Sequence, residues 1–162
     1  IMDGLVGSEM CIRDSGSTDK TKVIAEELTN RHPEIKIISN PEPNYGNALK
    51  TGFKIAKNDL VISFDIDYYS ESFLSEALKL ESEYSGITAS KRLGSSEDGR
   101  RFIRRLATNF FVILLKTLFG TKLSDTHGMK AIKKSEIEKF LPKVVSTQDI
   151  FDTELLLSLI HI

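Results

Sequence analysis

The sequence predicts an α/β fold in which helices are layered around a mostly parallel β-sheet. Segments with a strand-like pattern alternate with segments of helical periodicity from about residue 18 to residue 143. The segment "LVISFD" at 60–65 is a continuous apolar run, which is typical of a strand covered on both faces. Ligands of such sheets bind at the carboxyl ends of the strands, so polar residues that follow a strand are the first candidates for a site.

The first half of the chain supplies two helices and two strands. Thr18 or Asp19 can cap the first helix, and Pro33 closes it. "EIKIISN" then alternates as a strand, and "PEPNYG" has the composition of a loop. "NALKTGFKIAKND" places small and apolar residues on one helical face, directly before the strand at 60–65.

The second half continues the alternation. Ser70 or Ser72 can cap a helix over "SESFLSEALKLESEY", and "GITASK" is a short strand. "RRFIRRLATNFFVILLKTLFG" predicts a long helix that ends at Gly120, and "SEIEKFLPK" predicts a shorter one.

Composition and charge exclude several classes of protein. The chain has 162 residues, of which 40% are hydrophobic and 28% charged, as in an ordinary globular domain. The net charge of −1 gives no overall attraction to nucleic acid. No apolar run reaches the roughly 20 residues needed to span a bilayer. The single cysteine, Cys11, excludes a disulfide scaffold and fits a reducing compartment.

Both ends of the chain resemble translated sequencing adapter. "LVGSEMCIRDS" near the start matches one reading of a transposon-type adapter, and the final "LSLIHI" matches its reverse complement. We therefore expect residues 1–15 and 157–162 to be artefacts that do not pack as parts of the fold. The native segment is then 16–156, a fragment without the first strand of its domain.

Asp65 and Asp67 follow the apolar strand one residue apart. Two carboxylates this close repel each other unless a cation neutralises them. If the segment is extended, both side chains point to the same side and Ile66 points away. Two oxygen ligands on one side suit Mg²⁺ or Mn²⁺ that carries a substrate diphosphate. The alternative is that Asp67 caps the next helix and Asp65 is solvated.

These motifs together resemble the nucleotide-sugar domain of family-2 glycosyltransferases. "GSTDKT", "NPEPNYGNALKTG" and "FDIDYYS" match the D-D-G-S-x-D loop, the N-x-G-x-x-x-A-x-x-x-G pattern and the D-x-D motif of that family. "ASKRLGSSEDGRR", "SDTHGMKAIKK" and "DIFDTELL" are similar to the branch that loads sugars onto polyprenyl or dolichyl phosphate. "HGMKAI" departs from that branch's "CGFKLF"-like stretch, and Asp14 falls in the adapter-like segment.

The resemblance implies a truncated GT-A (Rossmann-like) three-layer domain and assigns roles to residues. Asp125 is implied as a catalytic base or orienter near the acceptor, with loop capping as the alternative. Asp65 and Asp67 would hold Mg²⁺ or Mn²⁺. The residues implied in nucleotide-sugar binding are Gly16, Asp19, Asn44, Gly46, Lys50 and Asp65. For Gly46 and Gly52, an ordinary turn or packing role is equally open.

A basic cluster stands beside the apolar helix after residue 106. The resemblance assigns Lys91, Arg92 and Arg104 to the acceptor phosphate, beside Arg100, Arg101 and Arg105. A basic start followed by an apolar body suits an anionic lipid head at a membrane surface, here the cytoplasmic face, although a solvated helix face is the usual meaning. No aromatic residues interleave the arginines, which argues against nucleic acid. His127 is expected to be solvated or packed, and Asp152 and Glu154 to be helix-start acids.

Three other functions stay open at this stage. The first is a related glycosyltransferase with a glycan or protein acceptor. The second is a Mg²⁺-binding receiver domain, although the D-x-D spacing fits it poorly. The third is a fragment without activity of its own, derived from an enzyme.

Overall fold

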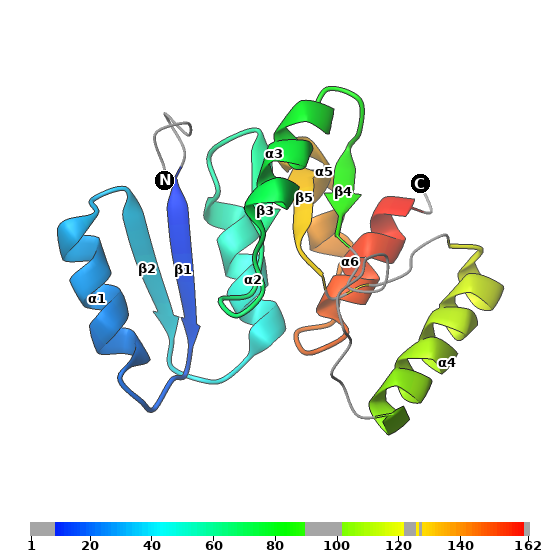
Figure 1. Ribbon diagram of the computed structural model, residues 1–162, viewed down its shortest axis with the longest axis horizontal. Helices are drawn as coiled ribbons and strands as arrows, with labels where there is room; N and C mark the ends of the chain where they lie inside the picture. Colours follow the sequence, from blue (N-terminus) through cyan, green and yellow to red (C-terminus); the bar gives the residue numbers. More distant parts are fainter. Residues whose placement is uncertain (1–8, 90–101, 122–125, 127, 161–162) are drawn as a thin grey trace.

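Helices and strands alternate along the chain, so the predicted α/β class is confirmed (Figure 1). The computed structural model describes residues 9–89, 102–121, 126 and 128–160. The strands are β1 (Met10–Ser15), β2 (Ile35–Asn40), β3 (Leu60–Ser63), β4 (Gly86–Thr88) and β5 (Lys130–Lys133). The helices are α1 (Thr21–Arg31), α2 (Tyr45–Ile55), α3 (Glu71–Leu80), α4 (Phe102–Phe119), α5 (Lys134–Phe140), the 3-10 turn η1 (Leu141–Lys143) and α6 (Phe151–Ile160).

The strands β1 and β2 form a parallel pair connected by α1. Met10 pairs with Ile35 at one end, and Ser15 pairs with Asn40 at the other. The N-cap of α1 is Lys20, one residue after the predicted Asp19, but Asp19 Oδ1 accepts a hydrogen bond from the backbone N of Thr21 at 2.9 Å and so still holds the start of the helix. The carboxyl ends of both strands therefore lie at the same edge.

The other three strands form a sheet with β5 in the centre. Residue Lys130 of β5 pairs with Ser63 on one side and Thr88 on the other, and both pairings are antiparallel. The sheet is therefore more mixed than the mostly parallel arrangement that the sequence predicts. The strand β5 is not predicted from the sequence, because the four-residue segment "KAIK" has no recognisable period. Its extended conformation depends on partners on both sides.

The hydrophobic core lies where α2, α5 and α6 pack on β5. Its largest fully buried side chains include Phe140, Phe151 and Ile132. The rings of Phe53 in α2 and Phe151 in α6 are stacked with centroids 6.3 Å apart. This contact fixes the start of α6 against α2, which matters for the site described below.

The expectation that residues 1–15 and 157–162 lie outside the fold is wrong for residues 10–15 and 157–160. The segment 10–15 forms β1 and pairs along its whole length with β2. The last residues continue α6, and Leu159 packs against the core. The physical reason is that strand pairing is made by backbone groups and accepts most sequences, while "LSLI" is apolar enough to extend a helix. A strand therefore does precede Gly16.

The long helix α4 ends at Gly120, as predicted, and stands to one side of the sheets (Figure 1). Gly120 has a φ of 62°, a left-handed conformation that is common after the end of a helix. Val112 and Leu115 are buried, whereas Leu106, Phe110, Ile113 and Leu118 are more than half exposed. Among the described helices, none combines the length and apolar character that crossing a membrane requires.

Candidate functional site at the carboxyl ends of the strands

The end of β1 forms a tight polar turn. Asp14 is only 5% exposed, and its Oδ1 accepts a hydrogen bond from the backbone N of Ser17 at 3.3 Å. Gly16 has a φ of 68°, and a Cβ at this position would lie 2.8 Å from the backbone N of Pro43. The turn therefore requires glycine, both for its conformation and for the close approach of the loop before α2.

The start of α2 is joined to this turn. The backbone N of Asn44 donates to Ser15 Oγ at 2.7 Å, and Asn44 Oδ1 accepts from the backbone N of Asn47 at 3.0 Å. Asn44 is thus the N-cap of α2. A Cβ on Gly46 would lie 2.5 Å from the carbonyl carbon of Thr147, so Gly46 lets α2 pack directly on the loop before α6. This contact supports the packing role for Gly46.

The D-x-D motif forms a turn after β3 and is not extended. The backbone N of Tyr68 donates to the carbonyl oxygen of Asp65 at 3.0 Å, and these two residues form an isolated antiparallel bridge. The predicted alternation of the two aspartates along an extended segment is therefore wrong, because the chain reverses direction at 66–67. Asp65 is half-buried and Asp67 is exposed. The N-cap of α3 is Ser70, whose Oγ accepts from the backbone N of Phe73, so Asp67 is not the cap.

The donor set at this turn is suited to a cation that also binds a ligand. Within the described ranges, no group of three or more His, Cys, Asp or Glu side chains forms a complete metal cage. Mg²⁺ commonly binds proteins through one or two carboxylates and takes its remaining ligands from water and substrate phosphates. Asp65 and Asp67 are the two carboxylates that this turn could offer to such an ion.

A buried polar network that the sequence does not predict lies beside the D-x-D turn. The Nζ of Lys130 is 3.1 Å from Asp152 Oδ2, and the two side chains are 3% and 0% exposed. Tyr45 Oη donates to the same Asp152 oxygen at 2.8 Å. The Lys130 Nζ also donates to the carbonyl oxygen of Gly128 at 2.9 Å. Because Lys130 is paired with Ser63, two residues before Asp65, the network is at the same edge of the sheet.

The pKa of the Tyr45 phenol is raised by its surroundings. Burial raises the pKa of the Tyr45 phenol, and the negative charges of Asp152, Asp65 and Asp149 raise that pKa further. The phenol therefore stays protonated at neutral pH and remains able to donate to Asp152. The effect of Asp65 means that the D-x-D turn and the start of α2 share one electrostatic environment. We call the edge formed by Asp14, Asn44, Tyr45, Asp65 and Lys130 the polar edge.

The remaining predicted residues have separate positions. Lys50 Nζ donates to the carbonyl oxygen of Val144 at 3.0 Å, and Asp19 is exposed at the start of α1. Arg104 belongs to the backbone of α4, but its side chain is outside what the structure describes. The residues that lie outside the described part of the chain are Lys91, Arg92, Arg100, Arg101, Asp125 and His127.

The two acids of "FDTELL" do more than begin a helix. Both lie in the first turn of α6, as predicted. Asp152 is fully buried in the network, while the two carboxylate oxygens of Glu154 accept from the backbone N atoms of Val145 and Ser146 at 2.9 and 2.7 Å. Glu154 therefore holds the loop that contacts α2.

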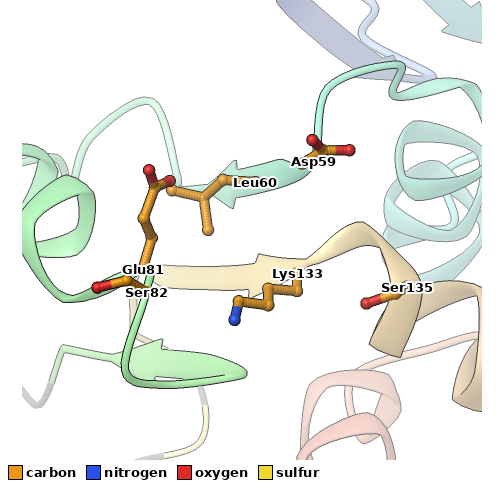
Figure 2. A pocket seen from close by; sticks show the side chains of 6 residues that line it. All are labelled: Asp59, Leu60, Glu81, Ser82, Lys133 and Ser135. Carbon is orange, nitrogen blue, oxygen red and sulfur yellow. The ribbon is translucent and has the colours of Figure 1, made fainter.

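A separate cavity of about 330 Å³ lies at the other end of β3 (Figure 2). It is lined by Asp59, Leu60, Glu81, Ser82, Lys133 and Ser135. Leu60 is the first residue of β3 and Lys133 the last of β5, so this cavity is opposite the polar edge. None of the predicted site residues lines it.

The fold is that of an α/β domain, and the polar edge is its candidate ligand site. Residues 7–141 match the model of the family described as "Glycosyl transferase family 2". The match extends over more than half of the chain, so the chain belongs to glycosyltransferase family 2. It is also 33% identical over 63 residues to a chondroitin synthase from Escherichia coli. That alignment covers 39% of this chain and 9% of the relative.

Proposed function

We propose that this chain is the donor-binding part of an enzyme that transfers a sugar from a nucleoside diphosphate sugar to a polyprenyl or dolichyl phosphate. The polar edge is the observation that supports the proposal most strongly. Contacts run from the turn at Gly16 through Asn44 and Tyr45 to the network beside Asp65. A single extended ligand with a nucleotide at one end and a sugar at the other matches such a continuous edge.

Asp65 and Asp67 are the residues that would hold Mg²⁺ or Mn²⁺. When bound, the ion neutralises charge that develops on the leaving diphosphate. Asn44 and the turn at Gly16 bind the nucleotide portion under this proposal, and Asp125 orients the acceptor. An acceptor phosphate is largely ionised at neutral pH, so the chemistry needs little help from a strong base.

The acceptor assignment rests on α4 and the basic residues around its start. The exposed apolar side chains Leu106, Phe110, Ile113 and Leu118 suit the acyl boundary of a bilayer. Lys91, Arg92 and Arg104 would pair with the lipid phosphate. Under this proposal the enzyme works at the cytoplasmic face of a membrane.

A glycan acceptor is the second candidate. It is favoured by the similarity to the chondroitin synthase, whose name describes a protein that builds a polysaccharide. The exposed apolar face of α4 has no evident use with a soluble glycan.

The test compares acceptors with the same labelled donors. The purified enzyme that contains this chain is incubated with radiolabelled uridine and guanosine diphosphate sugars, Mn²⁺, and either polyprenyl phosphate in vesicles or a chondroitin oligosaccharide. We expect label in the lipid fraction only, and none when the divalent cation is chelated. Label on the oligosaccharide alone would favour the second candidate, and no transfer from any donor would refute both.

Substituting Arg104 separates the acceptor role from donor binding. Arg104→Ala should reduce transfer to lipid while leaving hydrolysis of the donor unchanged. Arg31→Ala is the matched control, because Arg31 is an exposed arginine at the end of a different helix. Equal loss in both assays would show that Arg104 has no specific acceptor role.

A further inference from the structure

The hydroxyl of Tyr45 has an unused capacity to accept hydrogen bonds. A phenolic hydroxyl donates one hydrogen bond and accepts up to two. Asp152 is the carboxylate of a buried ion pair with Lys130, and a carboxylate only accepts, so the Tyr45 proton is committed to Asp152 Oδ2 at 2.8 Å. Within the part of the chain that the structure describes, no group donates to the Tyr45 oxygen.

The network holds this hydroxyl in place. Tyr45 is the first residue of α2, directly after the Asn44 cap, so its backbone is fixed at the helix start. Its partner Asp152 is fully buried and held by Lys130 on the central strand. Because both the backbone of Tyr45 and its partner Asp152 are held in place, the hydroxyl loses little conformational freedom when a ligand binds.

The position of Tyr45 is compatible with contact to a ligand. The residue is 36% exposed, although its hydroxyl reaches a buried carboxylate. Lys130 pairs with Ser63, which places the network next to the strand end that carries Asp65. Tyr45 is therefore a partly exposed residue of the polar edge whose hydroxyl is bonded to the buried network.

We propose that Tyr45 is a donor-binding residue whose phenolic oxygen accepts a hydrogen bond from a hydroxyl group of the nucleotide sugar, and that Asp152 and Lys130 are positioning residues for it. The inference rests on the proposed function. Because its own proton is committed, Tyr45 selects a hydroxyl and not a phosphate oxygen, which can only accept. The hydroxyl belongs either to the ribose or to the transferred sugar, and the test distinguishes the two.

The experiment measures dissociation constants by calorimetry with Mn²⁺ present. Wild type and Tyr45→Phe are titrated with the nucleotide sugar that wild type binds, with the corresponding nucleoside diphosphate, and with deoxyribose and deoxysugar analogues. We expect Tyr45→Phe to weaken binding of the intact donor by about three- to tenfold, the range for one neutral hydrogen bond. For the analogue that lacks the contacted hydroxyl, Tyr45→Phe and wild type should have the same dissociation constant.

The pattern of losses assigns the hydroxyl. An equal loss for donor and nucleoside diphosphate indicates the ribose, and a loss for the donor alone indicates the transferred sugar. Asp152→Asn alone should weaken donor binding. The double variant Tyr45→Phe with Asp152→Asn should bind the donor as Tyr45→Phe alone does. Tyr84→Phe is the control, because Tyr84 is exposed after α3 and outside the network.

Two outcomes overturn the proposal in different ways. If Tyr45→Phe binds the donor as wild type does, Tyr45 has only a structural role. The same conclusion follows if Tyr45→Phe weakens the binding of every deoxy analogue as much as it weakens the binding of the donor. If wild type binds no nucleotide sugar, the proposed function itself is refuted, and this inference falls with it.

Discussion

Replacing Arg13 with methionine should stabilise the protein. Arg13 lies in β1, and its Nε, Nη1 and Nη2 atoms are all buried without a hydrogen-bond partner among the described residues. The guanidinium packs against α2 at Gly52, where a Cβ would lie 3.1 Å from Nε. Burial lowers the pKa of Arg13, which indicates a charge held where solvation is poor.

The magnitude follows from the unmet hydrogen bonds. One buried unsatisfied polar group costs about 1–3 kcal/mol, and charged groups cost more. Methionine has a similar length, fills the same space and needs no partner. Because the arginine residue is only partly enclosed, we expect a net gain of about 2 kcal/mol in the free energy of unfolding. For a chain of this size the gain raises the melting temperature by about 4–8 °C.

Urea denaturation followed by circular dichroism measures the effect. The expected result is a higher midpoint with an unchanged slope, since the surface exposed on unfolding hardly changes. Arg31→Met is the matched control, because Arg31 is 73% exposed and its ion pair with Glu27 is long at 3.9 Å. It should change the free energy of unfolding by less than about 0.5 kcal/mol. A lower midpoint for Arg13→Met would refute the reasoning and indicate that Arg13 has a favourable partner.

Other substitutions test the packing and the site. Gly46→Ala should cost about 1–3 kcal/mol in urea denaturation because its Cβ would lie 2.5 Å from the Thr147 carbonyl carbon; Gly86→Ala, with its nearest contact at 3.7 Å, is the control. Lys130→Met should cost about 3–5 kcal/mol by leaving Asp152 unpaired, and adding Asp152→Leu should recover most of it; a double variant as unstable as the single would contradict this. Asp67→Asn should leave the melting temperature unchanged and reduce sugar transfer about 10²–10³-fold, measured against Mn²⁺ concentration; wild-type metal dependence would exclude Asp67 as a ligand.

Local sequence patterns predicted most of the helices and their ends. Asp19, Ser70 and Gly120 mark helix ends through hydrogen bonds and backbone conformations that involve only residues nearby in the chain. The apolar strand before Asp65 was also predicted from its composition, but the predicted burial on both faces is wrong, because every residue of β3 is only half-buried and Phe64 is 44% exposed. The family resemblance also came from the sequence, because its motifs have fixed spacing.

Contacts between distant segments decided the rest. β5 is a strand because Ser63 and Thr88 flank Lys130, and "KAIK" alone gives no such indication. β1 is ordered because its backbone pairs with β2, whatever the origin of its side chains. The network of Tyr45, Lys130 and Asp152 joins residues as far as 107 positions apart, and no local pattern specifies such a meeting. The sequence by itself determined the helix ends, the apolar strand and the family motifs, because these depend on local chemistry. The tertiary structure alone decided which charges became buried partners, because burial depends on how the elements pack.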